Sequence, residues 1–309
     1  MSGVVLAATP EARSVARAKV RENVERLVRT EGKNLNAILR ELETMRTRLL
    51  AMLATGTEFD QARAREMIQE VERESVRLRS TLRAPLERSY REAANLGDMD
   101  AAENVREVLP QMDGFRISTG VSLDLIDAAT GRSADLVGDI SEAARTRLNA
   151  LMRRSATGSN RAADVATAIG EVLSKEGRPT GVFGTLATQT ERVHRTETHA
   201  LYEVAGKART RQIAEQSPWV IQEVWITILD NRTRDSHRDM NGATITVGES
   251  FNFGAGPTWS KVSHEQAQRD GGTIGLAVMG PHDAILPAEE AVNCRCTRGI
   301  RRGPRKEGR

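Results

Sequence analysis

The residues best suited to chemistry gather in one stretch of the chain, from Trp225 to Cys296. It holds both cysteines of the protein and three of its five histidines. Cys294 and Cys296 are separated by one residue, so in an extended segment their thiols point to the same side. Together with the imidazole of His237, the two thiolates could hold a tetrahedral Zn²⁺ ion. Zinc is therefore the one cofactor that these residues suggest.

A zinc site needs a fourth ligand, for which Asp230, His199 and His282 are candidates. Two cysteines alone cannot fill a structural site, and Cys-x-Cys is a weaker signal than two Cys-x-x-Cys knuckles. We therefore favour reduced cysteines in or near the core over a bound metal. A disulfide between such close neighbours is disfavoured in a reducing compartment.

His237 and the nearby acids Asp230 and Asp235 allow a different kind of site. They could form an acid–base pair or hold Mg²⁺ for phosphodiester cleavage. That alternative function is a metal-dependent hydrolase or nuclease centred on Asp230, His237, Cys294 and Cys296. The same residues could instead form a hydrogen-bonded clamp between a strand and the Cys-x-Cys segment. We favour the clamp, because no nucleophile has an evident base and no second carboxylate cluster follows at regular spacing.

Two long amphipathic helices precede this stretch. Apolar residues from Leu35 to Met52 follow the 3-4 alternation of a coiled-coil seam, which predicts a helix packed against a partner within the chain. A break at 55–57 separates it from a second helix predicted over 58–95, which Pro85 should kink or shorten. The two predict an antiparallel hairpin of helices.

A helical middle region follows this hairpin. We expect a short helix that ends near Pro110, further helices over 122–130 and 132–154, and one that begins at an N-cap, Ser159. A long helix over 185–216 ends this region.

The periodicity changes after Pro218. Residues 219–229 and 243–253 are rich in β-branched and aromatic types and predict two strands, with Asn241-Gly242 as a turn. Residues 254–280 are rich in glycine and show little regular pattern. The predicted fold class is α+β, with a helical arm over 1–130, a domain of helices and a short antiparallel sheet over 131–300, and a basic tail over 301–309.

Several motifs in this order resemble a known family. Arg-Thr-Glu on a helix, then Asp-x-Arg-Thr-Arg-x-x-His before Asn-Gly, and finally Asn-Cys-Arg-Cys are similar to the head-morphogenesis domain of tailed phages, the minor head proteins like protein F of phage Mu. The resemblance covers approximately 132–298. Its motif residues are Arg195, Thr196, Glu197, Trp225, Asp230, Arg234, His237, Gly242, Pro287 and Asn293.

The resemblance implies a minor capsid protein, present in few copies, that acts with the portal protein during head assembly and DNA packaging. Its implied place is the virion, in the capsid interior or at the portal vertex, and the host cytoplasm during assembly. The major capsid protein, a scaffolding protein and phage DNA are further candidate partners. No catalytic activity is implied, so we expect that the protein is not an enzyme.

The net charge of +3 comes from the last residues of the chain. Residues 295–309 hold seven basic residues and one acidic residue, so the rest of the chain sums to −3. Such a cluster could bind DNA phosphates or an acidic partner, and the alternative is a solvated, frayed terminus. The candidate contacts are Arg298, Arg301, Arg302, Arg305 and Lys306. No stretch approaches the roughly 18 apolar residues that cross a bilayer, so we expect no membrane anchor.

Overall fold

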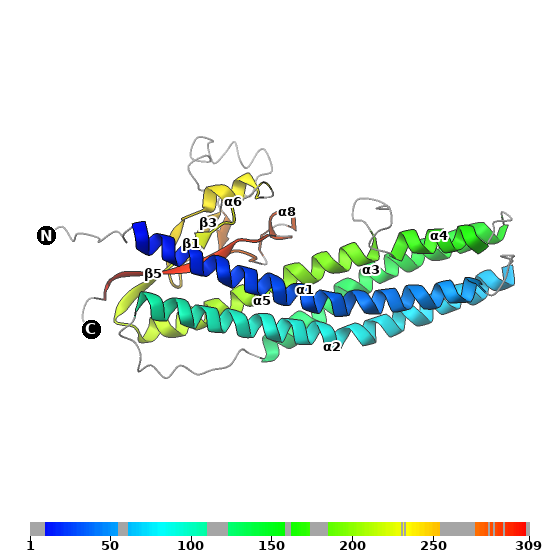
Figure 1. The fold of residues 1–309 in the computed structure, drawn as a ribbon, viewed down its shortest axis with the longest axis horizontal. Coiled ribbons are helices and arrows are strands. Elements are labelled where there is room, and N and C mark those ends of the chain that lie inside the picture. The colour runs from blue at the N-terminus through cyan, green and yellow to red at the C-terminus, as the bar shows by residue number, and fades with distance from the viewer. Residues whose placement is uncertain are drawn as a thin grey trace. The chain divides into compact units, whose positions relative to one another are not determined.

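The computed structural model describes residues 10–54, 61–109, 123–157, 162–173, 185–253 apart from 230 and 232, and 276–306 apart from 284, 287 and 293. Long helices come first and a region of short strands follows (Figure 1), which confirms the α+β class. The chain divides into two compact units. The sheet unit comprises Met1–Thr30, Arg91–Leu123 and Thr198–Arg309, and the helical unit comprises Glu31–Tyr90 and Asp124–Glu197.

The long helices supply nearly all of the described part of the helical unit and part of the sheet unit. They are α1 (Pro10–Ala54), α2 (Gln61–Val108), α3 (Leu123–Thr157), α4 (Ala162–Leu173) and α5 (Leu186–Gln216). Among the described residues, none of the helices combines the length and apolar character needed to cross a membrane. The predicted break at 55–57 and the predicted N-cap Ser159 lie outside the described residues.

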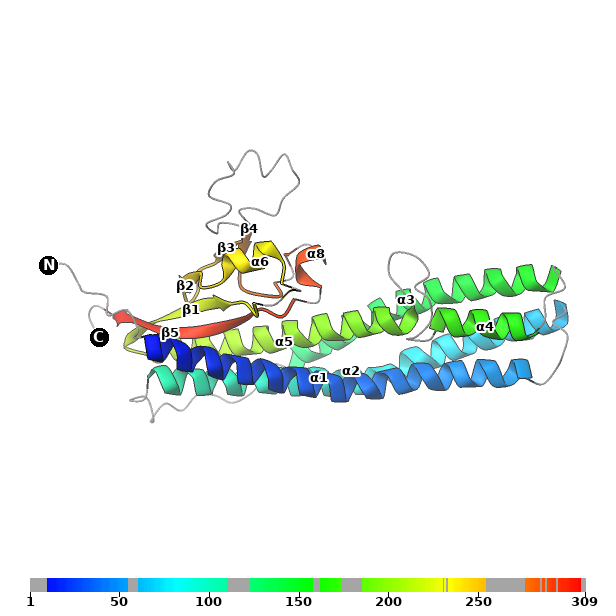
Figure 2. The same ribbon diagram turned by 45° about the horizontal axis from the view of Figure 1, so that its top comes forward.

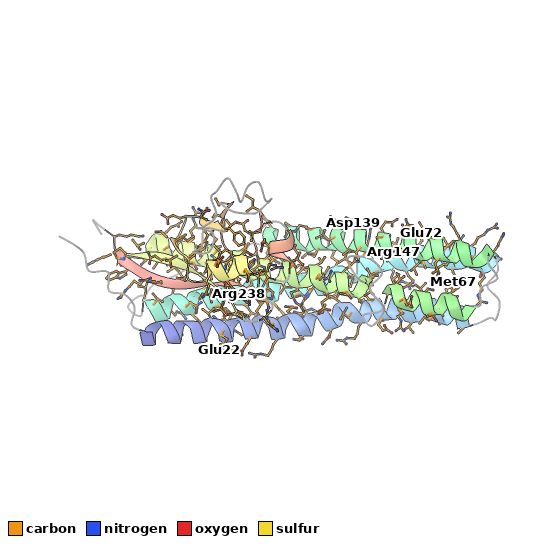
Figure 3. All side chains as sticks on the ribbon, turned by 90° about the horizontal axis from the view of Figure 1, so that it is seen from above. Glu22, Met67, Glu72, Asp139, Arg147 and Arg238 are labelled. Carbon is orange, nitrogen blue, oxygen red and sulfur yellow. The ribbon has the colours of Figure 1, made fainter. Side chains whose placement is uncertain are left out.

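The predicted seam on α1 lies in the core of the helical unit. Its members from Leu35 to Leu49 are buried, and Met52 is half-buried. Arg63 of α2 donates to the carbonyls of Met52 and Leu53 at 2.8 and 2.9 Å, which ties the end of α1 to α2. The two helices run side by side in this unit (Figure 2), as the predicted hairpin requires. Charged side chains such as Glu72 and Asp139 lie on its exposed faces (Figure 3).

Two predicted helix boundaries are wrong. α2 continues through Pro85 and Gly97 instead of ending near 95, and α3 continues through Gly131 as one helix. Leu82 and Leu86, which flank the proline, are 1% and 0% exposed, so packing on both sides outweighs the one lost backbone hydrogen bond. A single glycine inside a helix costs only about 1 kcal/mol relative to alanine, which a packed helix tolerates.

The sheet unit contains two small antiparallel sheets. The first has the order β2-β1-β5 and the second pairs β3 with β4. Among the described residues, two short helices lie between the strands in the sequence. The elements are β1 (Trp219–Ile226), α6 (Asp235–Met240), β2 (Thr244–Thr246), β3 (Phe251–Phe253), β4 (Leu276–Val278), α8 (Ala288–Ala291) and β5 (Thr297–Arg305).

The predicted strands need two corrections. β1 ends at Ile226, three residues before its predicted end, and Leu229 is 64% exposed. The single strand predicted over 243–253 is two strands in different sheets, because a turn that contains Gly248 at φ +101° separates β2 from β3. Asn241-Gly242 does form the predicted turn, with Gly242 at φ +90°.

The alternative of a frayed, solvated terminus is wrong for residues 301–305. They form the second half of β5, which pairs with β1 from Ile226↔Thr297 to Trp219↔Arg305. The guanidinium of Arg302 lies 4.8 Å from the centre of the Trp219 ring, and the amide of Lys306 donates to the Pro218 carbonyl at 2.8 Å. Backbone pairing with β1 therefore orders a segment whose Arg, Gly and Pro content disfavours a strand.

Candidate functional site

α6 and the segment between α8 and β5 hold the chemically capable side chains of the sheet unit, and β1 lies beside them. The chain leaves β1, forms α6 and returns, so that the amide of Gly242 donates to the carbonyl of Trp225 at 2.8 Å. Two hydrogen bonds from side chains hold the segment between β1 and Gly242 in place. Asn241 Oδ1 accepts from the Thr227 amide at 3.1 Å, and Thr227 Oγ1 donates to the His237 carbonyl at 2.8 Å. His237 is thereby held beside the end of β1.

His237 meets both cysteines in the interior. Its Nδ1 atom lies 3.1 Å from Cys296 Sγ and 3.4 Å from Cys294 Sγ. The Cys296 amide lies 3.4 Å from Cys294 Sγ, and Thr227 Oγ1 lies 3.5 Å from Cys296 Sγ. We call His237, Cys294 and Cys296 the His–Cys cluster; its three ligand atoms all lie within 4.8 Å of one another.

The other nitrogen of His237 faces a carboxylate. Nε2 lies 3.0 Å from Glu290 Oε2, an ion-pair distance, although the contact lacks the alignment of a hydrogen bond. Ser236 Oγ donates to the same oxygen at 2.9 Å. Arg234 donates to the carbonyls of Glu290 and Val292, at 3.3 and 2.6 Å. Arg234 and Ser236, at the start of α6, therefore bind the segment that leads to the cysteines.

Apolar and aromatic side chains surround the His–Cys cluster. The ring centre of His237 lies 6.1 Å from that of Trp225 and 5.6 Å from that of Phe253, both in edge-on contacts. His237 and Cys294 are each 2% exposed and Cys296 is 4% exposed. Both cysteines are free thiols and belong to one apolar core with Trp225, Met240, Phe251, Phe253, Val278 and Leu286.

These contacts shift the acidity of each member. Burial lowers the pKa of His237, but the contacts with the Cys296 sulfur and the Glu290 carboxylate outweigh burial and raise that pKa to about 9. The hydrogen bond from the Cys294 thiol, helped by His237, lowers the pKa of Cys296 well below its usual value, and raises that of Cys294. The contact with His237 also lowers the pKa of Glu290. The arrangement therefore favours a thiolate at Cys296.

A thiolate beside an imidazole can serve two kinds of chemistry. It can attack a substrate as a nucleophile, which requires access to the sulfur, or it can bind a soft divalent metal. Both sulfur atoms belong to side chains that are at most 4% exposed, so the described residues leave no approach for a substrate. Burial therefore argues against a nucleophile and leaves a metal ligand or a hydrogen-bonded clamp as the two candidate roles.

Two further histidines meet close by in the sheet unit. The rings of His199 and His282 have centres 5.2 Å apart, and His282 adopts a left-handed backbone with φ +61°. Burial lowers the pKa of His282, which keeps its ring neutral. Neither histidine belongs to the group of ligand atoms within 4.8 Å, and Asp230, the third candidate for a fourth ligand, lies outside the described residues.

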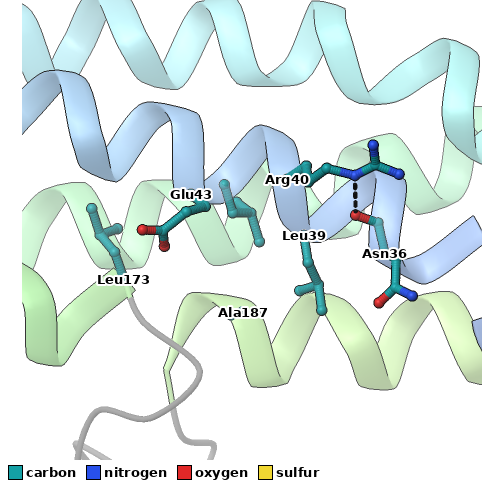
Figure 4. A pocket seen from close by; sticks show the side chains of 7 residues that line it. Asn36, Leu39, Arg40, Glu43, Leu173 and Ala187 are labelled. Atoms are coloured by element: carbon teal, nitrogen blue, oxygen red, sulfur yellow. Dashed lines mark hydrogen bonds between the residues drawn. The ribbon is translucent and has the colours of Figure 1, made fainter.

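A separate pocket lies in the helical unit (Figure 4). It has a volume of about 430 Å³, and Arg40 Nε donates to the Asn36 carbonyl at its wall. None of the candidate site residues of the sequence analysis lines it. The lining residues are Asn36, Leu39, Arg40, Leu42, Glu43, Leu173 and Ala187.

Comparison with known proteins relates this part of the chain to a protein family. The model of the family described as "Phage Mu protein F like protein" matches residues 148–298. Just under half of the chain is therefore similar to that family. The match starts within α3 and ends at Arg298 of β5, so it includes the whole His–Cys cluster. No curated protein and no solved structure matches the chain.

The Arg-Thr-Glu element of the Mu F-like segment lies on α5 in the helical unit. Arg195 pairs with Glu31 at 2.8 Å and with Glu191 at 3.1 Å, whereas Glu197 pairs with Arg132. The two charges of the motif therefore make separate ion pairs, as predicted for residues two apart on a helix. The Oγ1 atom of Thr196 is buried and has no hydrogen-bond partner among the described atoms.

The other motif residues of the Mu F-like segment lie in the sheet unit. Trp225 is 0% exposed in its core, and Arg234 donates to the backbone carbonyls of Glu290 and Val292. Asp230, Pro287 and Asn293 lie outside the described residues. Sequence reasoning missed Glu290, although an acid four residues before Cys294 was a signal that could have revealed it.

A buried ion cluster at the end of the Mu F-like segment was also missed. Arg298 is 7% exposed, with its guanidinium 2.7 Å from both Glu203 and Glu223, and Thr297 donates to Glu203 at 2.5 Å. Arg298 therefore does not join the four other predicted cations at the surface. The available signal was Glu223, an acid that shares the inward face of β1 with Ile221 and Trp225.

Proposed function

We propose that this protein is a minor capsid protein that associates with the portal during head assembly and DNA packaging in a tailed phage or prophage. The observation that carries the proposal is the match of residues 148–298 to the phage Mu F-like family, which supports a head-morphogenesis protein. Its place would be the capsid interior or the portal vertex of the virion, with host cytoplasm as the site of assembly. The major capsid or scaffolding protein would be a second partner.

A structural role accounts better for the motif residues than a hydrolase does. Among the described residues, the members of the His–Cys cluster are buried and Arg234 and Arg298 bind groups of the protein itself. Buried groups that bind one another stabilise a fold, whereas catalysis requires that substrate reach them. We therefore propose that the protein is not an enzyme.

The exposed part of β5 is the surface that we propose for DNA or an acidic partner. Arg302 and Arg305 are exposed and Arg301 is half-buried. Lys306 is partly engaged, because its Nζ donates to the Ala214 carbonyl at 2.7 Å. Arg298 is excluded from this surface by its buried ion pairs.

Co-assembly with the portal tests the proposed function. The full chain is co-expressed with the portal and major capsid genes of its own genome, and the assembled heads are separated by sedimentation. We expect a few copies of the chain to co-sediment with heads that contain the portal, and fewer with heads assembled from the capsid protein alone. Heads that assemble with the portal but retain none of the chain would contradict the proposal.

A further inference from the structure

The His–Cys cluster offers three ligands of the types that zinc sites use, and a tetrahedral site would take its fourth ligand from outside these three residues. We propose that Cys294, Cys296 and His237 bind one Zn²⁺ ion, which fastens the segment before β5 to α6. This inference does not depend on the role in head assembly. It rests on three independent observations: the ligand distances, the groups behind the ligands, and the burial of the cluster.

The distances between the ligand atoms suit zinc. Bonds of about 2.3 Å to sulfur and about 2.0 Å to nitrogen place the ligand atoms of a tetrahedral site about 3.5–3.8 Å apart. His237 Nδ1 lies 3.1 Å from Cys296 Sγ and 3.4 Å from Cys294 Sγ. Outward side-chain shifts of roughly half an ångström would admit the ion between them.

The groups behind the ligands are those that zinc sites use. A zinc-bound histidine generally gives its second nitrogen to a carboxylate, which fixes the ring and raises its basicity. Glu290 takes that place at 3.0 Å from His237 Nε2, and Ser236 holds Glu290 at 2.9 Å. The Cys296 amide points to Cys294 Sγ at 3.4 Å, which stabilises negative charge on that sulfur.

Burial distinguishes this site from a catalytic one. Structural zinc is enclosed, whereas catalytic zinc keeps a position open for water or substrate. The cluster is at most 4% exposed and is packed against the rings of Trp225 and Phe253. Zinc in such surroundings cross-links segments 57 to 59 residues apart in the sequence, in a unit with a small apolar core.

Elemental analysis of the full chain, purified without a histidine tag, tests the proposal directly. We expect one zinc per chain, and loss of that zinc in Cys294→Ser and in Cys296→Ser. His194→Gln is the matched control, because His194 is an equally buried histidine that bonds to Ser89 in the helical unit and should leave the zinc in place. Serine variants that fold and keep stoichiometric zinc would overturn the assignment.

A separate substitution tests the role of Glu290. Glu290→Gln keeps the size of the side chain and leaves all three ligands, so we expect one zinc at saturation but about 10–100-fold weaker binding in competition with a chelating dye. An unchanged affinity would remove Glu290 from the site.

Cobalt substitution keeps the proposal falsifiable if the serine variants do not fold. Wild-type protein is stripped with a chelator and titrated with Co²⁺. We expect thiolate-to-cobalt charge-transfer absorption and the intense visible bands of tetrahedral cobalt, both removed by one equivalent of Zn²⁺. Stripped protein that remains folded but shows neither signal, with both thiols equally reactive before and after zinc, would overturn the proposal.

Discussion

A single buried arginine joins three elements of the sheet unit. Arg298 of β5 reaches Glu203 on α5 and Glu223 on β1, each at 2.7 Å. Glu223 is 0% exposed and Glu203 is 5% exposed, so both carboxylates depend on this guanidinium for compensation. One residue therefore determines whether two acids can remain inside the unit.

We predict that Arg298→Met destabilises the protein by about 3–5 kcal/mol, because it leaves two buried carboxylates with no compensating charge. Methionine keeps the apolar stem, so the loss reports the charge. Urea unfolding at neutral pH measures it. The control is Arg305→Met on the exposed end of the same strand, which should change the free energy of unfolding by at most about 0.5 kcal/mol. Equal losses in the two variants would contradict the prediction.

A third buried acid, Asp100, makes the stability of the protein depend on pH. Asp100 is 1% exposed; Tyr202 donates to it at 2.8 Å and Arg26 of α1 pairs with it. Burial raises the pKa of Asp100, against the effects of Tyr202, Arg26 and Lys19, while the charge of Glu103 adds to the rise. A raised folded-state pKa gives stability that is present below the unfolded value and is lost as pH rises through the folded value.

We therefore predict a difference in pH profile between wild type and Asp100→Asn. The asparagine cannot titrate, so the free energy of unfolding of wild type relative to the variant should fall as pH rises from below 4 through the mildly acidic range. Urea unfolding at a series of pH values measures this difference. A difference that grows with pH would mean that Arg26 and Tyr202 outweigh burial and lower the pKa of Asp100.

At the residue level, the sequence predicted the contact of His237 with the cysteines but not its surroundings. The Trp, His and Cys-x-Cys residues were recognisable by type and order. Glu290 and Arg298 were not recognised in these roles, because each acts through partners on other elements that pairing in three dimensions brings together. The type of a residue reveals a candidate ligand, whereas the groups that contact and support that ligand follow only from the fold.

At the scale of elements, α2 and α5 approach closely within the sheet unit at two glycines. A Cβ atom on Gly97 would overlap the backbone carbonyl of Tyr202, and one on Gly206 would lie 3.1 Å from the Gly97 carbonyl. Arg209 on α5 pairs with Asp98 on α2 at 3.0 Å beside this approach. The absence of side chains at both positions therefore sets the distance between the helices.

We predict that Gly97→Ala destabilises the protein by about 1–3 kcal/mol, because backbone must move to admit the methyl group. Gly131→Ala is the matched control, since its Cβ would meet nothing within 4 Å and alanine favours the helix by about 1 kcal/mol. Thermal unfolding of both variants measures the two effects. We expect the change in stability to have opposite signs in the two variants. The same sign in both would show that helix propensity, and not the close approach of α2 and α5, determines the effect at Gly97.

The elements that the sequence predicted well are those with local signals. The long helix α5 follows from periodicity alone, and β1 from its β-branched and aromatic residues. Gly97 and Gly131 misled the prediction, because a glycine that admits a neighbouring helix looks the same as one that ends a helix. β5 was missed because its order comes from pairing with β1, more than 70 residues earlier in the sequence, and not from its own composition.

At the scale of the whole molecule, positive charge is concentrated at one end of the sequence. Outside 295–309 the chain sums to −3, so most of the protein repels a polyanion. β5 is an edge strand of its sheet, and its exposed arginines also discourage pairing with another strand. Any affinity for DNA should therefore depend on these few cations.

We predict that the full chain binds duplex DNA with an affinity that falls with salt, and that Arg302→Gln with Arg305→Gln reduces the slope of log K against log salt by about 1.8. Each lost phosphate contact removes about 0.9 from that slope on duplex DNA. Fluorescence anisotropy over a range of salt concentrations measures it. Point substitutions are preferable to truncation, because deletion from Gly303 onward would remove part of β5 itself.

The matched control removes two positive charges elsewhere. Arg21 and Arg73 are 81% and 67% exposed, and each pairs with a glutamate on its own helix, Glu25 and Glu70 respectively. Arg21→Gln with Arg73→Gln lowers the net charge by the same amount as the β5 variant and should leave the slope nearly unchanged. Equal reductions would mean that DNA responds to net charge alone. No change in the β5 variant would leave an acidic protein, such as a portal or capsid subunit, as the partner of this strand.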